Sequence, residues 1–361
     1  MQRLNCNPKE QGFYMPAQWV PHKLTILAWP FGESEWQGAL AEVRREFMAF
    51  LCQILADEPV LLLLAPGEAE SFAEAQENEH LSLSNGANLR LATVALDDIW
   101  MRDIAPIQLM QKSSDHLTSV KWQFNGWGGK FPHSQDCAVG YKLLELMGVG
   151  DFFDVPIILE GGAVEVDGEG TGLTTRSCLL NPNRRSLDEE QLSQIIKDYF
   201  GLERLVWLNN GLVGDHTDGH IDMVARFTPS GNILINHTDD RHNPHFHVLQ
   251  DNYERLSQEF GASRLICLPL PQQTINRAVT ENFADLSKIE GLVCANYANF
   301  YVTTHSVIVP AFADQVDEVA RSIVASCFPY HQVVSLPARA ILQNGGGIFN
   351  CLAQQVPKGS F

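Results

Sequence analysis

Strand-like and helical segments alternate along the whole chain with no linker between them, and this alternation restricts the fold more than any other feature. Apolar residues repeat at helical spacing in residues 36–57, and a strand-like run follows at 59–64. Further strands are expected at 204–208, 232–236, 264–268, 292–296, 306–309 and 332–336, and further helices at 186–200, 247–260 and 314–327. The alternation of strand pairs and single helices predicts a single α/β domain over residues 1–361.

Charge narrows the choice of ligand. The chain carries 25 Lys and Arg against 43 Asp and Glu, a formal net charge of −18, and 45% of its residues are hydrophobic. That apolar share is enough for a large core and excludes wholesale disorder. Each contact with a phosphate needs a cationic side chain, so nucleic acid is a disfavoured partner, whereas a cationic small molecule is attracted.

The cysteine pattern and the lack of long apolar runs indicate where in the cell the protein is expected. The eight cysteines form no CxxC pair, and most are expected to be small core residues, among them Cys267 and Cys294 in strand-like runs. The N-terminus lacks the apolar segment of a secretory signal. The longest aliphatic run, residues 60–65, is far shorter than the ~20 residues of a membrane span. We therefore expect a soluble, cytoplasmic protein with no membrane partner.

Polar residues lie beside glycines at the ends of several strand-like segments. Glycine in such a place lets the backbone approach a ligand closely and lets a turn adopt positive φ. These segments are residues 97–103, 124–129, 159–162, 214–222 and 345–351. Together they supply a thiol, a histidine and several carboxylates on an acidic chain.

Cys351, which follows three glycines by three residues, is the candidate nucleophile. A thiol with an ordinary pKa of about 8.5 needs a cationic neighbour or a cationic substrate to ionise near neutral pH. His220 is a candidate general acid and base, and Asp222 would face the same side of a strand. A guanidinium is planar and always charged, and it donates paired hydrogen bonds to carboxylates. A thiol that attacks a guanidinium carbon between carboxylates therefore explains both the acidity and the residue types.

Taken together, these segments resemble the agmatine deiminase branch of the guanidino-group-modifying enzymes. The matching motifs run in the family's order from residue 15 to residue 358 and include MPAQW, IWMRDIAP, FNGWGGKF, LEGGAVEVDGEGTG, GHID and GGGIFNCLAQQVPKG. The resemblance implies a pentein α/β propeller of five ββαβ-type modules with pseudo-fivefold symmetry. It implies hydrolysis of agmatine to N-carbamoylputrescine and ammonia, as in putrescine and polyamine biosynthesis. A homodimer or a larger oligomer is also implied.

The resemblance also implies roles for individual residues, with no metal and no organic cofactor. Cys351 would form a covalent thiouronium intermediate, and His220 would act as general acid and base. Asp103 and Asp222 would hold the guanidinium, and Glu160 would orient His220. The substrate-binding residues would be Asp103, Trp100, Asp222, Glu160 and Gly346.

Two departures from the family pattern leave other functions open. Asn350 stands where the family commonly has His, and residues 215–218 differ from the usual stretch before the histidine. A deiminase of free arginine or of peptidyl-arginine is one alternative, and a catalytically weak guanidine-binding protein is another. The pair Asp97 and Asp98 is expected to be a solvated strand end or cap rather than a ligand. The His-rich residues 237–247 are expected to form a polar loop before a helix rather than a metal site.

Overall fold

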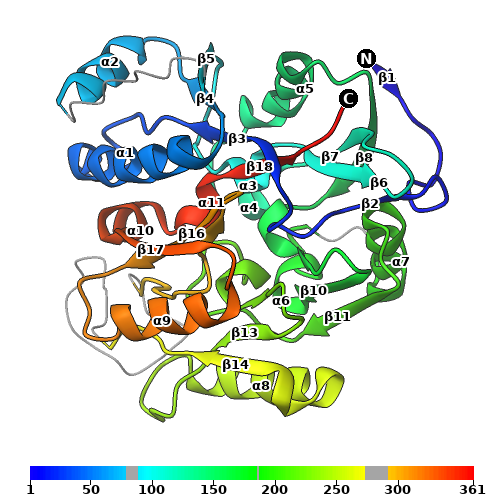
Figure 1. The fold of residues 1–361 in the computed structure, drawn as a ribbon, viewed down its shortest axis with the longest axis vertical. Coiled ribbons are helices and arrows are strands. Elements are labelled where there is room, and N and C mark those ends of the chain that lie inside the picture. Colours follow the sequence, from blue (N-terminus) through cyan, green and yellow to red (C-terminus); the bar gives the residue numbers. More distant parts are fainter. Residues whose placement is uncertain (79–87, 185–186, 273–291) are drawn as a thin grey trace.

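The computed structural model describes residues 1–78, 88–184, 187–272 and 292–361, and their strands form five sheets (Figure 1). Each sheet contains one repeated unit, which we call a module: an antiparallel strand pair, a helix, and a strand parallel to the second member of the pair. The elements of the first two modules in chain order are β6 (Ile107–Gln111), β7 (Leu117–Gln123), α5 (Asp136–Met147), β8 (Asp151–Ile158), then β9 (Glu165–Val166), β10 (Thr171–Thr175), α7 (Glu189–Phe200) and β11 (Arg204–Leu208).

The next two modules have the same order of elements. They are β12 (Ala225–Phe227), β13 (Ile233–Asn236), α8 (Phe246–Phe260), β14 (Leu265–Leu268), then β15 (Tyr301–Val302), β16 (Ser306–Ala311), α9 (Asp317–Cys327) and β17 (Gln332–Pro337). Both ends of the chain build the remaining module. Its elements are β18 (Gln354–Pro357), β3 (His22–Ala28), α1 (Leu40–Asp57) and β4 (Val60–Leu64), extended by α2 (Ala69–Asn78) and β5 (Leu89–Thr93).

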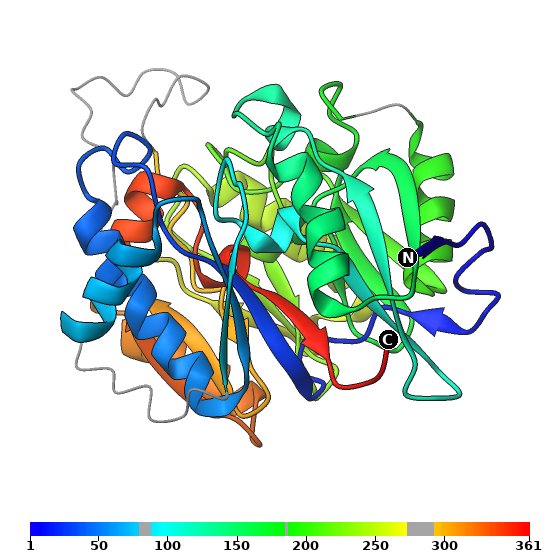
Figure 2. The same ribbon diagram turned by 90° about the horizontal axis from the view of Figure 1, so that it is seen from above.

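The long helices lie on the outside of the molecule, and short helices lie near its centre (Figures 1 and 2). The central ones include α3 (Met101–Ile104), α4 (Gly126–Gly129) and α11 (Phe349–Leu352). The remaining elements are β1 (Gln2–Arg3), β2 (Phe13–Tyr14), η1 (Gly161–Ala163), α6 (Arg176–Leu179), η2 (Ile221–Met223), η3 (Ala262–Arg264) and α10 (Arg339–Gly345). The architecture is the expected pentein propeller of five ββαβ modules.

The packing of α1 illustrates why the modules form. Val43, Phe47, Leu51 and Ile54 recur every three or four residues and are buried, so one face of the helix covers β3 and β4. β4 reads VLLLL and is buried at every position, as expected for a strand flanked by parallel neighbours and covered on both faces.

Most expected elements are present, with three corrections. Residues 292–296 form no extended strand. The Ala295 backbone N–H donates to Val293 O, and the Asn296 side-chain Nδ2 donates to Cys294 O. These local hydrogen bonds stand in place of those that a neighbouring strand would make. The helix expected over 186–200 begins at Glu189, after a capping box made by Asp188 and Gln191, and position 186 lies outside the described residues. Cys267 is exposed rather than part of the core.

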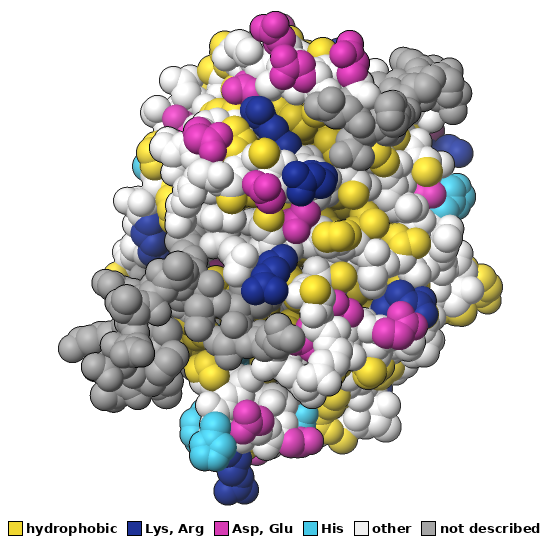
Figure 3. Space-filling view, turned by 90° about the vertical axis from the view of Figure 1, so that its left-hand side faces the viewer, with side chains coloured by type: hydrophobic (Ala, Val, Ile, Leu, Met, Phe, Trp, Pro, Cys, Tyr) yellow, Lys and Arg dark blue, Asp and Glu magenta, His cyan; other side chains and the backbone are white. Residues whose placement is uncertain are grey.

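Within the described residues, no helix has the length and apolar character needed to cross a membrane. The face in Figure 3 carries acidic side chains scattered among apolar, neutral and a few basic ones.

Candidate active site

A pocket opens beside the short central helices. It is lined by aromatic rings, carboxylates, glycines and one thiol, among them Asp98, Trp100, Asp103, Trp127, Asp215 and Cys351. These residues come from segments that are far apart in sequence. The pocket therefore exists only when the modules are assembled.

The position of Cys351 depends on the glycines that precede α11. A Cβ on Gly345 would lie 2.5 Å from Trp100 Cζ2, and one on Gly347 would lie 2.6 Å from Trp100 Cζ3. Only glycine therefore lets the Trp100 ring lie against this loop. Gly346, between them, has a φ of 84° and also lines the pocket.

The Cys351 thiol is 5% exposed and lies among acceptors rather than cations. Its Sγ is 3.4 Å from Asn299 Oδ1 and 3.8 Å from Asp222 Oδ2. Burial, followed by the charges of Asp222 and Asp103, raises the pKa of Cys351 well above its ordinary value. The thiol is therefore protonated at neutral pH until a cation approaches it.

Asp103 is held by two donors. Its Oδ2 accepts a hydrogen bond from Trp127 Nε1 at 2.8 Å, and its Oδ1 accepts one from the Gly162 N–H at 2.9 Å. Trp127 itself has a φ of 52°, a conformation that few non-glycine residues adopt. The glycine-rich turn of α4 thus serves to aim the indole N–H at the carboxylate.

Three polar atoms converge in front of Gly162. A Cβ there would lie 2.5 Å from His220 Nδ1, 3.0 Å from Asp103 Oδ1 and 3.1 Å from Asp222 Oδ2. The missing side chain therefore leaves an imidazole and two carboxylates facing one small space.

His220 is fixed through its backbone. Its N–H donates to Asp215 Oδ2 at 3.1 Å and to Thr217 Oγ1 at 3.0 Å, so the unusual residues 215–218 form the turn that places the imidazole. Burial lowers the pKa of His220, but the Asp103 carboxylate, 3.8 Å from Nδ1, and the neighbouring Cys178 and Glu160 raise it more, to well above its ordinary value. The free site therefore contains an imidazolium and a neutral thiol.

Glu160 is fully buried and paired with a cation. Its Oε1 accepts a hydrogen bond from Arg184 Nε at 2.6 Å, and the Arg184 guanidinium also contacts Asp218 and the Thr217 carbonyl oxygen. Arg184 therefore ties Glu160 to the same turn that holds His220.

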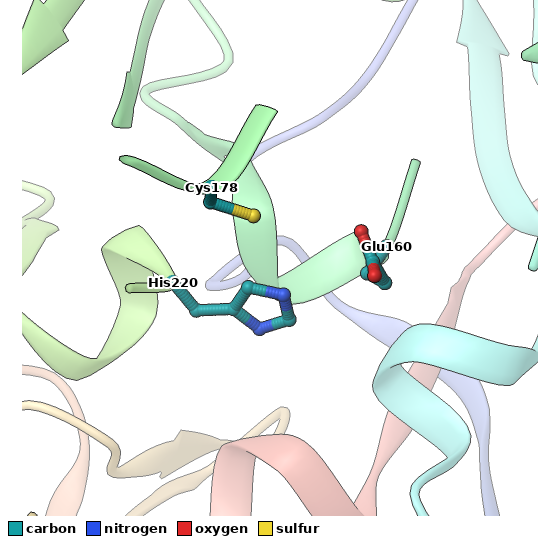
Figure 4. A group of neighbouring side chains, drawn as sticks. All are labelled: Glu160, Cys178 and His220. Atoms are coloured by element: carbon teal, nitrogen blue, oxygen red, sulfur yellow. The ribbon is translucent and has the colours of Figure 1, made fainter. Parts of the chain in front are cut away.

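Glu160, Cys178 and His220 have the side-chain types of a zinc site. Their ligand atoms lie within 4.8 Å of one another, and the three side chains point toward a common centre (Figure 4). Arg184, however, already pairs with the Glu160 carboxylate, and a divalent cation here would lie against a guanidinium. We therefore interpret Cys178 and Glu160 as the polar surroundings of the imidazole rather than as metal ligands.

Four buried carboxylate oxygens have no donor among the described residues, and two of them, Asp222 Oδ1 and Glu160 Oε2, belong to candidate site residues. Buried acceptors are normally paired, and an unpaired one in a folded protein calls for an explanation. A cation with several N–H groups in one plane would satisfy acceptors of this kind.

The structure places the expected residues in two groups. Asp103, Asp222, His220 and Cys351 surround the space in front of Gly162 and Cys351, whereas Trp100 and Gly346 line the approach to it. Glu160 contacts Arg184 and does not line the pocket.

Sequence reasoning missed Trp127, Gly162 and Asn299, which bind or border these groups. The first two lie in the glycine-rich segments it singled out, but Asn299 carried no local signal. It also treated Asp97 and Asp98 alike. Asp97 accepts the N–H of Gln135 at the start of α5, whereas Asp98 lines the pocket.

The five-module fold and this site together define a hydrolase of the pentein class, which acts on C–N bonds in linear amidines. The chain matches the model of the Porphyromonas-type peptidyl-arginine deiminase family over residues 14–357, and it belongs to that family.

Relatives of known name support this placement. The agmatine deiminase of Pseudomonas aeruginosa strain LESB58 is 33% identical, with 99% of each chain covered. The structure of the agmatine deiminase of Enterococcus faecalis superposes with a TM-score of 0.88 at 27% identity, covering 99% of this chain and all of that one. The agmatine deiminase of C. jejuni, solved as a cysteine-to-serine variant with substrate bound, superposes with a TM-score of 0.83 at 29% identity, covering 97% of each chain.

Proposed function

We propose that this chain hydrolyses the guanidinium group of agmatine to give N-carbamoylputrescine and ammonia. The carrying observation is the pocket lined by Asp103 and the Cys351 thiol, against which the buried Asp222 and His220 side chains lie. A guanidinium fits this space by charge and by its planar set of donors. The relatives named agmatine deiminase support the same substrate.

The first half of the reaction forms a covalent intermediate. The guanidinium binds between the carboxylates of Asp103 and Asp222, and its positive charge favours the Cys351 thiolate. The thiol proton passes to solvent, and the thiolate sulfur attacks the central carbon, whose C=N electron pair moves onto nitrogen. His220 donates its proton to the leaving nitrogen, and ammonia departs to leave a thiouronium on Cys351.

The second half regenerates the thiol. His220, now neutral, takes a proton from a water molecule, whose oxygen attacks the thiouronium carbon. The carbon–sulfur bond breaks, the hydroxyl proton of the adduct passes to the departing sulfur, and the ureido product leaves with the Cys351 thiol restored. The Asp103 and Asp222 carboxylates hold the remaining nitrogens in place throughout.

The charge of the pocket favours agmatine over arginine. Its lining includes Asp98, Asp103 and Asp215 and, among the described residues, no Lys or Arg. Burial raises the pKa of Asp98 to about 7; the charges of Glu35 and Asp97 raise it further, and hydrogen bonds from the Ile99 N–H and the Trp100 side chain oppose the shift. A distal ammonium would favour the charged Asp98, whereas the carboxylate of free arginine would meet like charge.

The test is a substrate panel with the purified full-length chain. Ammonia and ureido product are measured with agmatine, arginine and an arginyl peptide. We expect equimolar products from agmatine and at least about a tenfold lower kcat/KM for arginine, since one uncompensated charge contact is worth about that factor. Preferred turnover of arginine or of the peptide would select the alternative substrate, and stoichiometric binding without turnover would select the guanidine-binding protein.

Three further expectations belong to the same proposal. The five modules act as one domain, because β18 at one end of the chain completes the sheet that β3 begins at the other. A cytoplasmic location is supported by the eight cysteines, all of them among the described residues and none in a disulfide. Assembly into a homodimer or larger oligomer, and a place in polyamine biosynthesis, stay predictions; light scattering measures the first.

A further inference from the structure

Asn350 is buried beside the site and precedes the candidate nucleophile. Its side chain is 3% exposed, and its Nδ2 donates to Asp222 Oδ2 at 2.7 Å. This contact lies on one oxygen of the carboxylate, and Asp222 Oδ1 is left without a partner among the described residues. The oxygen that Asn350 holds is also the one nearest the thiol, 3.8 Å from Cys351 Sγ.

The orientation of the Asn350 amide is fixed from its other end. Its Oδ1 accepts hydrogen bonds from Gln18 Nε2 at 2.8 Å and from Arg102 Nη2 at 3.2 Å. Both neighbours are donors at that position, so a flipped amide would turn its NH2 group toward the guanidinium of Arg102 and its oxygen toward Asp222.

Arg102 is itself held firmly. It is 4% exposed, its Nε donates to the backbone oxygen of Asn350 at 3.2 Å, and its Nη1 donates to Gln354 Oε1 and Gln355 Oε1 at 3.1 and 2.7 Å. One guanidinium thus supports both the backbone and the side chain of Asn350.

We infer that Asn350 is a positioning residue, which holds the Asp222 carboxylate toward the guanidinium through a neutral donor. The inference rests on the proposed function. A neutral amide suits this place because it supplies an N–H without adding charge. A carboxylate there would repel Asp222, and a hydrocarbon would remove one hydrogen bond each from Asp222 Oδ2, Gln18 Nε2 and Arg102 Nη2.

Other charged and titratable groups also face Asp222, and the test has to separate Asn350 from them. They are Arg102 and Asp103 on α3, Glu165 on β9, His220 before η2, Arg226 on β12 and Cys351 on α11. None of these residues is replaced by a change at position 350, but Arg102 contacts the Asn350 side chain as well, so its effect on a new carboxylate needs a control of its own.

The deciding variant is Asn350→Asp. At low pH a protonated Asp at this position still donates an O–H to Asp222, and kcat/KM for agmatine should lie within about threefold of wild type. At high pH two carboxylates face each other, and kcat/KM should fall by about 10- to 100-fold, the value of a hydrogen bond to a charged group. The wild-type profile should lack this additional alkaline loss.

Gln355→Glu is the matched control, because it makes the same amide-to-acid change against Arg102 without contacting Asp222. It should keep the shape of the wild-type profile. A uniform decrease for Asn350→Asp at every pH, or no decrease, would overturn the inference. A wild-type enzyme without agmatine turnover would instead contradict the proposed function.

Asn350→Ser serves if the Asp variant does not fold. It removes the donor that lowers the pKa of Asp222. The acidic limb of its kcat/KM profile should therefore move to higher pH by about one unit relative to wild type. An unmoved limb would overturn the inference.

Discussion

The Cys351 thiol is surrounded by groups that oppose its ionisation in the free protein. Burial and the carboxylates of Asp222 and Asp103 all raise its pKa. The same carboxylates attract a guanidinium, whose charge would reverse the balance. The guanidinium would therefore be both the cation that favours the thiolate and the group that the thiolate attacks.

This reversal predicts selective labelling of Cys351. Neutral iodoacetamide should label it slowly at pH 7 and faster as pH rises toward its raised pKa, because reactivity follows the thiolate fraction. The cationic 2-chloroacetamidine should label it at least about tenfold faster at pH 7, since its charge binds between the carboxylates. Rates are followed by mass spectrometry, with Cys351→Ala as control. Equal rates for both reagents would contradict this picture.

A second residue-scale prediction concerns Gly162. In Gly162→Ala the new methyl group would lie 2.5 Å from His220 Nδ1 and would push the imidazole away from Asp103 and Asp222. We expect kcat/KM for agmatine to fall by about 100-fold or more, the scale of a misplaced reacting group. Gly150→Ala is the control, because no heavy atom lies within 4 Å of a Cβ there. Wild-type activity in Gly162→Ala would mean that substrate binds elsewhere.

At the scale of elements, Glu58 joins parts of the fold that are distant in sequence. It follows α1, accepts a hydrogen bond from His22 Nδ1 of β3 at 2.9 Å, and accepts the Thr304 N–H between β15 and β16 at 2.7 Å. Burial raises the pKa of Glu58, but His22, Thr25 and Thr304 lower it more, so the net shift is downward. This carboxylate therefore stabilises the junction between two modules.

Glu58→Gln should lower the free energy of unfolding by about 3 kcal/mol, because it leaves a buried donor without its charged partner. Since the folded-state pKa of Glu58 is depressed, its contribution is present above its ordinary value of 4.5 and is lost as pH falls below it. Urea unfolding at pH 7 and pH 4 measures both effects. Glu42→Gln on the same helix is the control, since Glu42 is exposed. Equal losses for the two variants would contradict the role of Glu58.

Element types were predictable where one periodicity dominates. The buried positions of α1 recur at helical spacing, and β11 and β13 lie in the expected segments. Residues 292–296 were predicted wrongly, because apolar content alone does not reveal that local hydrogen bonds of Ala295 and Asn296 replace a ladder.

The residues of the site were predictable only where they lie near one another in the sequence. His220 and Asp222 lie close in sequence and Cys351 follows a glycine run, so their types and spacing are visible in the chain. Trp127 and Asn299 act on residues far away in sequence, Asp103 and Cys351, and such contacts arise only from the assembly of modules.

At the scale of the whole molecule, the net charge of −18 creates a field that attracts cations. Figure 3 shows that acidic groups are scattered over one face rather than gathered at one place, so this attraction is general. The pocket carboxylates then add a local and specific attraction.

This field predicts that kcat/KM for agmatine falls with salt. The screening length shortens from about 30 Å at 0.01 M to about 8 Å at 0.15 M ionic strength, and we expect a loss of about threefold over that range. Labelling of Cys351 by neutral iodoacetamide is the control and should change little. A salt-independent kcat/KM would show that the net charge has no part in substrate capture.

The central claim is that Cys351 attacks a guanidinium carbon, and acid-quenched mass spectrometry during turnover tests it most directly. With agmatine, the peptide that contains Cys351 should gain the mass of agmatine less ammonia, and this adduct should form and decay fast enough to account for turnover. Cys351→Ala should show neither adduct nor ammonia release. Undiminished turnover by Cys351→Ala, or an adduct on another cysteine that keeps pace with turnover, would contradict the claim.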